Sequence, residues 1–132
     1  MKDCIFCKII NNEIPSSTIY EDDLVKVFLD VNPATNGHML IIPKKHYENI
    51  LDVDQEIYNY SIKLIKEKLY SLVKEKLNCS GITISQNNEY GQEVKHLHIH
   101  LIPRYENDLN SYTYNKEILL PLDEVYSKLK SE

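Results

Sequence analysis

The chain has 132 residues, a mass of 15.5 kDa and a formal net charge of −5. This length and the 42% of hydrophobic residues predict a single domain over residues 1–132 with a core of ordinary size. The negative charge argues against binding to long nucleic acid, and without a long apolar run or a signal peptide we expect a cytoplasmic protein with no membrane span.

The first third of the chain predicts a short helix followed by three strands. Residues 3–11 carry an apolar stripe at helical spacing, with Asp3 as the expected N-cap. Residues 18–20 and 24–30 are rich in β-forming side chains and predict a hairpin. After a loop at 32–37, residues 38–43 are nearly all apolar, which predicts a central strand covered on both sides.

The remaining elements complete an α+β pattern. Apolar side chains at helical spacing predict one long helix from Asp52 or Asp54 to about Leu77, ended by Asn78 and Gly81. Residues 82–86 and 96–102 predict two antiparallel strands, and residues 105–121 are expected to be irregular. A short helix over 122–130 follows, with its apolar side chains facing inward (Val125 and Leu129). We therefore expect a five-stranded, mostly antiparallel sheet with one long helix and short N- and C-terminal helices.

Three of the five histidines stand at alternate positions: His96, His98 and His100. On a strand, alternate side chains share one face, so three imidazoles would lie side by side. A half-exposed edge strand that happens to carry histidine is the simplest interpretation. The clustering favours chemistry instead, because imidazole can exchange protons near neutral pH, bind a metal or act as a nucleophile.

Two kinds of chemistry are open to this strand. As ligands of a catalytic zinc ion the three histidines would leave an open position, but no carboxylate that could orient them is near in sequence. As a nucleophile, one ring nitrogen would attack phosphorus or an acyl carbon while the other is held by a hydrogen bond. His98 has a histidine on either side and is best placed to attack. In the preceding turn, Asn87 and Gln92 could donate to phosphate oxygens or serve only as turn residues.

A second motif is the C-x-x-C pair of Cys4 and Cys7. With Cys79 the chain has three cysteines, and an odd number in a reducing compartment speaks against a disulfide framework. The pair has no strand before it, unlike a thioredoxin-like active site. Metal binding and free thiols are therefore the main alternatives.

The motif over residues 96–102 resembles the signature of the histidine triad (HIT) superfamily. Four further segments resemble the family in the same order: residues 4–15, the hairpin segments within 20–33, residues 37–46, and residues 91–94 before the triad. The resemblance covers residues 4 to about 104 and leaves 105–132 as a C-terminal tail. Among HIT proteins, the chain looks most like the Hint-like bacterial members.

This resemblance implies a homodimeric hydrolase that cleaves nucleoside 5′-phosphoramidates or related nucleotidyl conjugates. His98 would attack the α-phosphorus and form a nucleotidyl-histidine intermediate, without a catalytic cofactor. The remaining contacts to a purine nucleotide would come from His38, His100, Asn87 and Gln92 at the phosphate and from Asp30, Val31 and Phe28 at the ribose and base. Alternatives are a dinucleoside polyphosphate hydrolase, a regulatory nucleotide-binding module and, last, a metal-dependent hydrolase.

The resemblance to bacterial members with the same cysteine pair also implies a structural zinc ion. With three histidines needed at the phosphate, its ligands would be Cys4, Cys7, His46 and His96. His96 would then serve a different centre from His98 and His100, which requires the strand to twist or end near residue 95.

The sequence departs from the Hint-type pattern at three places. Glu93 stands where those proteins place a serine. The shorter turn leaves both Asn87 and Asn88 as candidates for the phosphate contact. The tail lacks their tryptophan-containing C-terminus.

Overall fold

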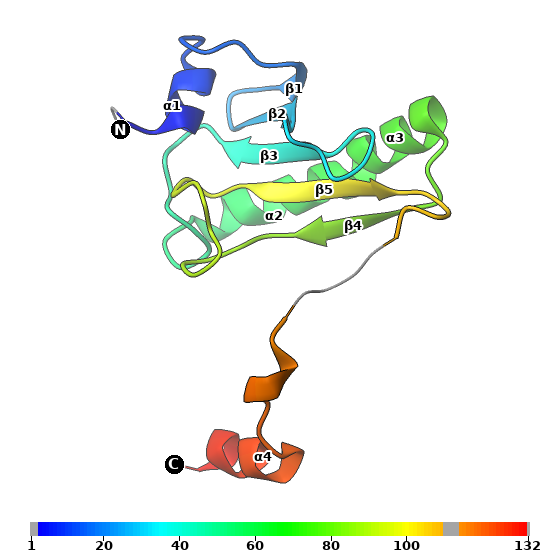
Figure 1. Cartoon of the computed structure of the whole chain (residues 1–132). Helices are drawn as coiled ribbons and strands as arrows, with labels where there is room; N and C mark the ends of the chain where they lie inside the picture. The colour runs from blue at the N-terminus through cyan, green and yellow to red at the C-terminus, as the bar shows by residue number, and fades with distance from the viewer. Residues whose placement is uncertain (1–2, 110–113, 132) are drawn as a thin grey trace.

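A computed structural model describes residues 3–109 and 114–131. Its centre is a five-stranded sheet with the order β1-β2-β3-β5-β4, in which every neighbouring pair is antiparallel (Figure 1). The predicted fold class is therefore confirmed. The strands are β1 (Thr18–Glu21), β2 (Val25–Leu29), β3 (Met39–Pro43), β4 (Gly81–Ser85) and β5 (Ile99–Arg104).

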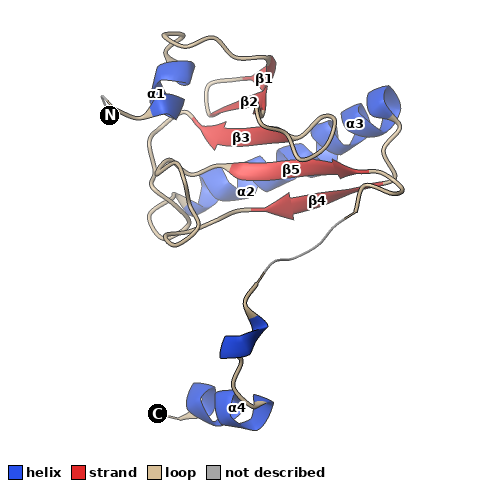
Figure 2. Cartoon of the chain, in the orientation of Figure 1, coloured by secondary structure: helices blue, strands red, loops and turns tan. Residues whose placement is uncertain are grey.

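A long helical segment covers one face of the sheet (Figure 2). It consists of α2 (Gln55–Leu64), the π-helical turn η1 (Ile65–Leu69) and α3 (Tyr70–Leu77). Asp54 caps it by accepting the N–H of Glu56, and Asn78 ends it in the left-handed region with φ 54°. The sequence predicted the helix and both ends but not the π turn. Leu64 and Ile65, where the π turn begins, are both buried in the core between the helix and the sheet.

The helix α1 (Ile5–Ile10) packs on the opposite face of the sheet. Phe6 and Ile9 are buried there in a second apolar cluster with side chains of β2 and β3 (Phe28, Leu40 and Ile42). The predicted Asp3 cap is wrong, because the N-cap is Cys4, whose sulfur accepts the N–H of Cys7. The buried ammonium of Lys26 donates to the Ile9 carbonyl oxygen at 3.0 Å and fastens the end of α1 to β2.

The histidine strand begins at Ile99, not at His96. Before Ile99 the backbone leaves the sheet, and the N–H of Leu97 donates to Tyr47 in a neighbouring loop. His96 and His98 both contact Phe6, and Ile99 packs in the core on the helical side. The imidazoles therefore share one face, as predicted from the alternation, and that face is the α1 side, although of the three histidines only His100 belongs to the strand.

The C-terminal segment contains the short 3-10 helix η2 (Lys116–Ile118) and α4 (Leu122–Lys130), which lies away from the sheet in Figure 1. The predicted helix is confirmed. Its predicted inward face is wrong, because Leu129 is 77% exposed and none of the side chains of α4 is buried. Part of the stretch predicted as irregular, residues 110–113, lies outside the described residues.

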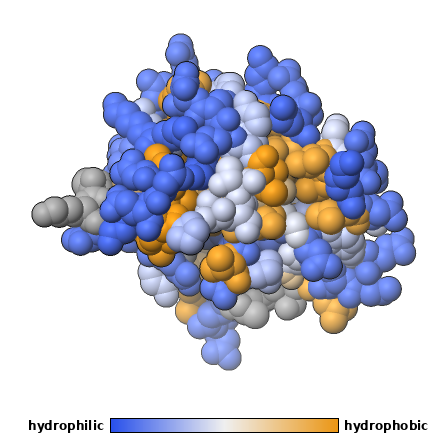
Figure 3. All heavy atoms as spheres, turned by 90° about the horizontal axis from the view of Figure 1, so that it is seen from above, coloured by the Kyte–Doolittle hydropathy of each residue, from blue (hydrophilic) through white to orange (hydrophobic). Residues whose placement is uncertain are grey.

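The surface seen from above is mainly hydrophilic, with apolar patches between the polar side chains (Figure 3). Over residues 3–109 and 114–131, none of the helices combines the length and the apolar character needed to cross a membrane.

Candidate functional site

A cavity of about 360 Å³ lies on the α1 side of the sheet and is lined by side chains of α1, β2, β3 and β5. Its volume is within the range of small-molecule sites. Most of the wall is apolar, and the polar groups on it include Asp30, His98 and His100. The apolar wall is formed by Ile5, Phe6, Ile9, Ile14, Pro15, Phe28, Leu29, Val31, Leu40 and Val94. The cavity thus offers an apolar slot beside two imidazoles and the carboxylate of Asp30, and the exposed Glu93 also lies on its wall.

The backbone orients the ring of His98. Its Nδ1 lies 2.8 Å from the carbonyl oxygen of His96, and the side chain is buried. A carbonyl oxygen can only accept, so Nδ1 carries the proton and donates it. In the neutral ring Nε2 then keeps its lone pair. This is the tautomer that a nitrogen nucleophile requires.

The ring of His100 is oriented through His38. The N–H of Ala34 donates to His38 Nδ1 at 2.9 Å, so the neutral His38 ring carries its proton on Nε2. That nitrogen lies 2.9 Å from His100 Nδ1, which must accept the hydrogen bond. The proton of neutral His100 is therefore on Nε2. His98 and His100, with ring centroids 5.1 Å apart, are thus set to opposite roles, one with a free lone pair and one with a donor.

Burial favours the uncharged forms of His38 and His100. Desolvation lowers the pKa of His38, against the opposing charge of Asp30. Desolvation also lowers the pKa of His100 to about 4, and charges on His98 and His38 lower it further. One oxygen of Asp30 accepts the N–H of Asn32 at 2.9 Å, and the other lies 3.6 Å from His38 Nε2. Asp30 is the principal negative group close to this pair.

Asp30, His38 and His100 lie close enough together to be considered as metal ligands. However, His38 Nδ1 already accepts a hydrogen bond from Ala34, which leaves the proton on the nitrogen that a metal would need. A hydrogen-bonded relay describes these three side chains better than a metal site.

The structure brings Cys4, Cys7, His46 and His96 into one cluster, with their sulfur and nitrogen atoms within 4.8 Å of one another. The sulfur of Cys4 is 3.4 Å from His96 Nδ1, and that of Cys7 is 3.4 Å from His46 Nδ1 and 3.6 Å from His96 Nδ1. The two histidine Nδ1 atoms are 3.1 Å apart. The sulfurs come from Cys4 at the N-cap of α1 and from Cys7 within it, and the loops after β3 and before β5 supply the nitrogens.

The cluster has the donor set and spacing of a structural zinc site. A tetrahedral zinc ion separates its nitrogen and sulfur ligands by about 3.4–3.8 Å. His96 Nε2 donates to the Pro43 carbonyl at 2.9 Å, which leaves Nδ1 with a lone pair toward the cysteines. Burial lowers the pKa of His96 to about 4, and burial together with Cys4 raises the pKa of Cys7. The residues present fit a zinc ion.

The amide side chains predicted at the phosphate differ in how firmly hydrogen bonds hold them. Gln92 is buried, its Nε2 donates to the Glu48 and Val94 carbonyls at 2.6 and 3.0 Å, and its Oε1 accepts the Glu89 N–H. These bonds hold the loop before His96. Asn88 accepts the N–H of Ile50 at 2.8 Å and also contacts Gln86.

Asn87 is exposed at the same turn and is absent from the described wall of the cavity. Glu93 lines the cavity and is exposed. Neither side chain is hydrogen-bonded to His98 or His100 in this structure.

Two contributors to the site were not assigned a role in the sequence. Phe6 was placed in an apolar stripe, yet its ring touches the rings of His96 and His98. Ala34 acts through its backbone N–H, which carries no signature in sequence. The position of Phe6 between the two cysteines was the one available signal.

Comparison with known proteins matches the HIT domain family to residues 11–107. An uncharacterised HIT-like protein of Methanocaldococcus jannaschii is 46% identical over 130 residues, covering 96% of this chain and 98% of that protein. Adenylylsulfatase HINT3 of Arabidopsis thaliana is 37% identical over 107 residues, covering 80% of this chain and 54% of that protein. A solved zinc-bound histidine triad family protein from Mycobacterium smegmatis has a TM-score of 0.77 and 31% identity, covering 86% and 84% of the two chains. This chain therefore belongs to the HIT family, a superfamily that includes nucleotide-binding hydrolases.

Proposed function

We propose that the protein hydrolyses nucleoside 5′-phosphoramidates or related nucleotidyl conjugates to the nucleoside monophosphate. The observation that carries the proposal is the opposite orientation of two neighbouring rings, His98 with a free Nε2 lone pair and His100 with a protonated Nε2. One ring is suited to attack phosphorus and the other to donate to a phosphate oxygen. The adenylylsulfatase of Arabidopsis, a relative by sequence, supports a nucleotidyl substrate.

The reaction would proceed in two displacements. In the first, His98 Nε2 forms a bond to the α-phosphorus, and the bond from phosphorus to the leaving amine breaks as the amine takes up a proton from solvent. In the second, water attacks the same phosphorus, loses a proton to solvent and displaces His98, which releases the monophosphate. His100 Nε2–H would stabilise the developing charge on the phosphate oxygens in both steps, with His38 holding its tautomer.

The apolar part of the cavity would take the nucleoside. Phe28 and Val31 lie on its wall and offer contact to a purine base, and Asp30 offers a carboxylate oxygen to the ribose hydroxyls. Asn87 could reach the phosphate after a small movement of its turn. For Gln92 we propose that it holds the loop before His96 in addition to its predicted contact with the phosphate, since its amide is hydrogen-bonded to three backbone groups.

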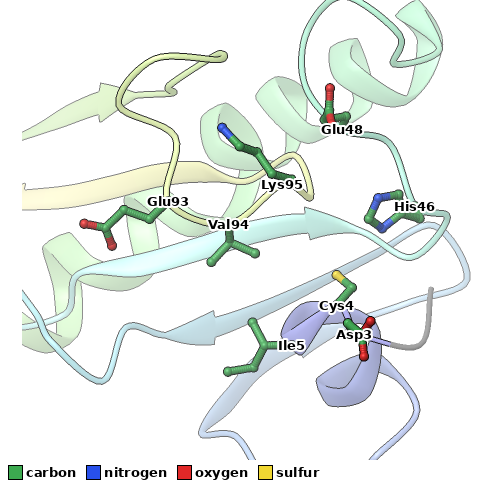
Figure 4. Close-up of a pocket in the computed structure, with 8 residues that line it drawn as sticks. All are labelled: Asp3, Cys4, Ile5, His46, Glu48, Glu93, Val94 and Lys95. Atoms are coloured by element: carbon green, nitrogen blue, oxygen red, sulfur yellow. The ribbon is translucent and has the colours of Figure 1, made fainter.

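A second hollow of about 510 Å³ adjoins the cavity, and Figure 4 shows the residues that line it. The charges on its wall support an amine rather than a polyphosphate as the leaving group. The two share Ile5, Glu93 and Val94. Three carboxylates and one ammonium line the hollow, and that ammonium donates to a backbone carbonyl instead. A chain of phosphates would be repelled there. The lining residues are Asp3, Cys4, Ile5, His46, Glu48, Glu93, Val94 and Lys95.

A structural zinc ion held by Cys4, Cys7, His46 and His96 is the second part of the proposal. The ligand spacing fits, and a zinc-bound relative has the same fold. The ion would join α1 to the loops that follow β3 and precede β5, and the chemistry at phosphorus would use no metal.

We also propose a homodimer. The outer side of β4 pairs with none of the strands among residues 3–109 and 114–131, and Ile84 on it is 46% exposed. Together with the exposed apolar side chains of α4, this edge offers surface for a second copy. A cytoplasmic location is proposed as well, since Cys4 and Cys7 are not joined in a disulfide.

Hydrolysis of adenosine 5′-phosphoramidate, followed by chromatography of the released monophosphate, tests the proposed activity. We expect turnover by the wild type and a loss of at least about a thousandfold in His98→Ala, which should still bind the monophosphate. A dinucleoside polyphosphate should be cleaved much more slowly than the phosphoramidate. Undiminished turnover in His98→Ala would reject the proposal.

A further inference from the structure

One side chain of α1 connects the cysteine–histidine cluster to the proposed nucleophile. Phe6 is buried between Cys4 and Cys7 in the sequence, and its ring meets His96 and His98 edge-on, with centroid distances of 5.9 and 5.1 Å. It also contacts Phe28 at 5.7 Å. Edge-to-face contacts of this kind restrict how an aromatic ring can rotate. The ring of His98 is therefore confined by a residue whose own position depends on the two cysteines.

A second connection runs through the backbone. The carbonyl of His96 accepts the Nδ1–H of His98 at 2.8 Å, and this bond sets the tautomer of His98. His96 itself is completely buried and is held through its ring, by Pro43 on one nitrogen and by the sulfurs and His46 on the other. The orientation of its carbonyl thus depends on where the cluster holds its ring.

The sheet does not hold this segment. The pairing of β5 with β3 starts at Ile99, opposite Ile41, so residues 96–98 lie outside the ladder of hydrogen bonds. In this segment the backbone N–H of Leu97 is tied to Tyr47, in the loop that also carries His46. The cluster and that loop therefore take the place that strand pairing would have in orienting His98.

We propose that the cysteine–histidine cluster is a positioning device for the nucleophile, with Phe6 as a positioning residue. The inference rests on the proposed role of His98 in the reaction. Disturbing the cluster releases the His96 carbonyl and the Phe6 ring, so His98 can carry its proton on either nitrogen. The fraction with a free Nε2 falls, and kcat falls with it. Binding of the nucleotide changes less, because among the described residues Cys7 lines neither the cavity nor the adjoining hollow, and His46 lines only the hollow.

Two variants of the cluster and one matched thiol control test this. Cys7→Ser and His46→Gln each remove one member, whereas Cys79→Ser alters a buried free cysteine on the other side of the sheet. With adenosine 5′-phosphoramidate we expect kcat to fall about 10–100-fold in the first two, with KM within about threefold, and no more than about a twofold change in Cys79→Ser. Bound zinc is measured in all proteins, and circular dichroism verifies the fold.

Nitrogen NMR of the His98 ring gives a readout that needs no turnover. The wild type should show the Nδ1–H tautomer, and the cluster variants a mixture, while Phe6→Leu should show the same change without loss of zinc. Variants that lose thermal stability but keep kcat and the Nδ1–H tautomer would overturn the proposal, because the cluster would then only stabilise the fold. If the wild type itself lacks turnover but the tautomer still changes in the variants, the proposed reaction fails and the coupling stands.

Discussion

His38 Nε2 lies 2.9 Å from His100 Nδ1. Through this hydrogen bond, a single backbone amide fixes which nitrogen of His100, a ring on the cavity wall, carries the proton. The amide of Ala34 can only donate, so His38 can only donate onward, and His100 is left with a donor on its far nitrogen. A donor on the cavity side is thus built without any charged side chain. This arrangement suits the proposed reaction, in which Nε2 of the other ring, His98, must keep its lone pair.

Replacing His38 should weaken catalysis through His100. His38→Ala removes the group that donates to His100 Nδ1, so the proton of His100 is no longer confined to Nε2. We expect kcat/KM for adenosine 5′-phosphoramidate to fall about 10–100-fold. His38→Gln, whose amide can still donate, should lose less. Equal losses in the two variants, with intact folds, would mean that donation from residue 38 is unimportant.

The neutral state of His100 makes stability depend on pH. Its pKa in the folded protein is lowered by burial to about 4, from an ordinary value of 6.5. Between about pH 6.5 and pH 4 the unfolded chain binds a proton that the folded protein does not, so the free energy of unfolding decreases as the pH is lowered. Urea unfolding at about pH 7.5 and pH 5 should show this decrease, and His100→Gln should reduce it. An unchanged pH dependence in His100→Gln would contradict the assignment.

Removal of the metal should destabilise the fold. A zinc ion that binds only the folded protein, at a free concentration about a hundredfold above its Kd, adds about 2.7 kcal/mol and raises Tm by about 10 °C for a chain of this size. Calorimetry before and after chelation measures the shift, which zinc but not magnesium should restore. Cys7→Ser should abolish the shift and Cys79→Ser should retain it. A Tm that is insensitive to chelation would contradict a structural metal.

The anchoring of α1 can be tested at a buried lysine. Lys26 is 2% exposed and donates to the Ile9 carbonyl at 3.0 Å, with Asn12 Oδ1 at 3.4 Å. Lys26→Met removes this donor, leaves the Ile9 carbonyl with the N–H of Asn12 alone and removes the contact of Nζ with Glu21 at 3.9 Å. It should lower the free energy of unfolding by about 1–3 kcal/mol in urea. Lys44→Met removes a more accessible ammonium that pairs with Glu21 and should cost less than about 1 kcal/mol. Equal effects would argue that Lys26 is not an anchor.

The spacing of apolar residues, together with turn-forming and helix-capping residues, was sufficient to predict most of the fold. Alternating and continuous apolar runs located the five strands. Helical spacing located the long helix, with a start predicted at Asp52 or Asp54, of which Asp54 is the observed cap, and an end at Asn78. The π turn was not predicted, because the apolar spacing of this segment indicates a helix without distinguishing an α turn from a π turn. The inward face of α4 was predicted from spacing alone, yet Leu129 is exposed in this chain.

The site was predictable where a side chain carries the chemistry. The grouping of Cys4, Cys7, His46 and His96 followed from a family resemblance and from the demand for four ligands. The sequence could not predict where the histidine strand begins or which groups orient the site residues through hydrogen bonds. The start of β5 at Ile99, the hydrogen bonds of Gln92 and the backbone donor at Ala34 depend on contacts between distant segments.

The account depends most on His98 as the nucleophile, and a trapped intermediate tests this directly. Wild-type protein is mixed with adenosine 5′-phosphoramidate, quenched within a single turnover under conditions that preserve a phosphorus–nitrogen bond, and analysed by peptide mass spectrometry. We expect an adenylyl group on the peptide with residues 96–104, located on His98 and absent from His98→Ala. Rapid formation of the monophosphate with no adduct at any time, or an adduct on another residue, would contradict the account.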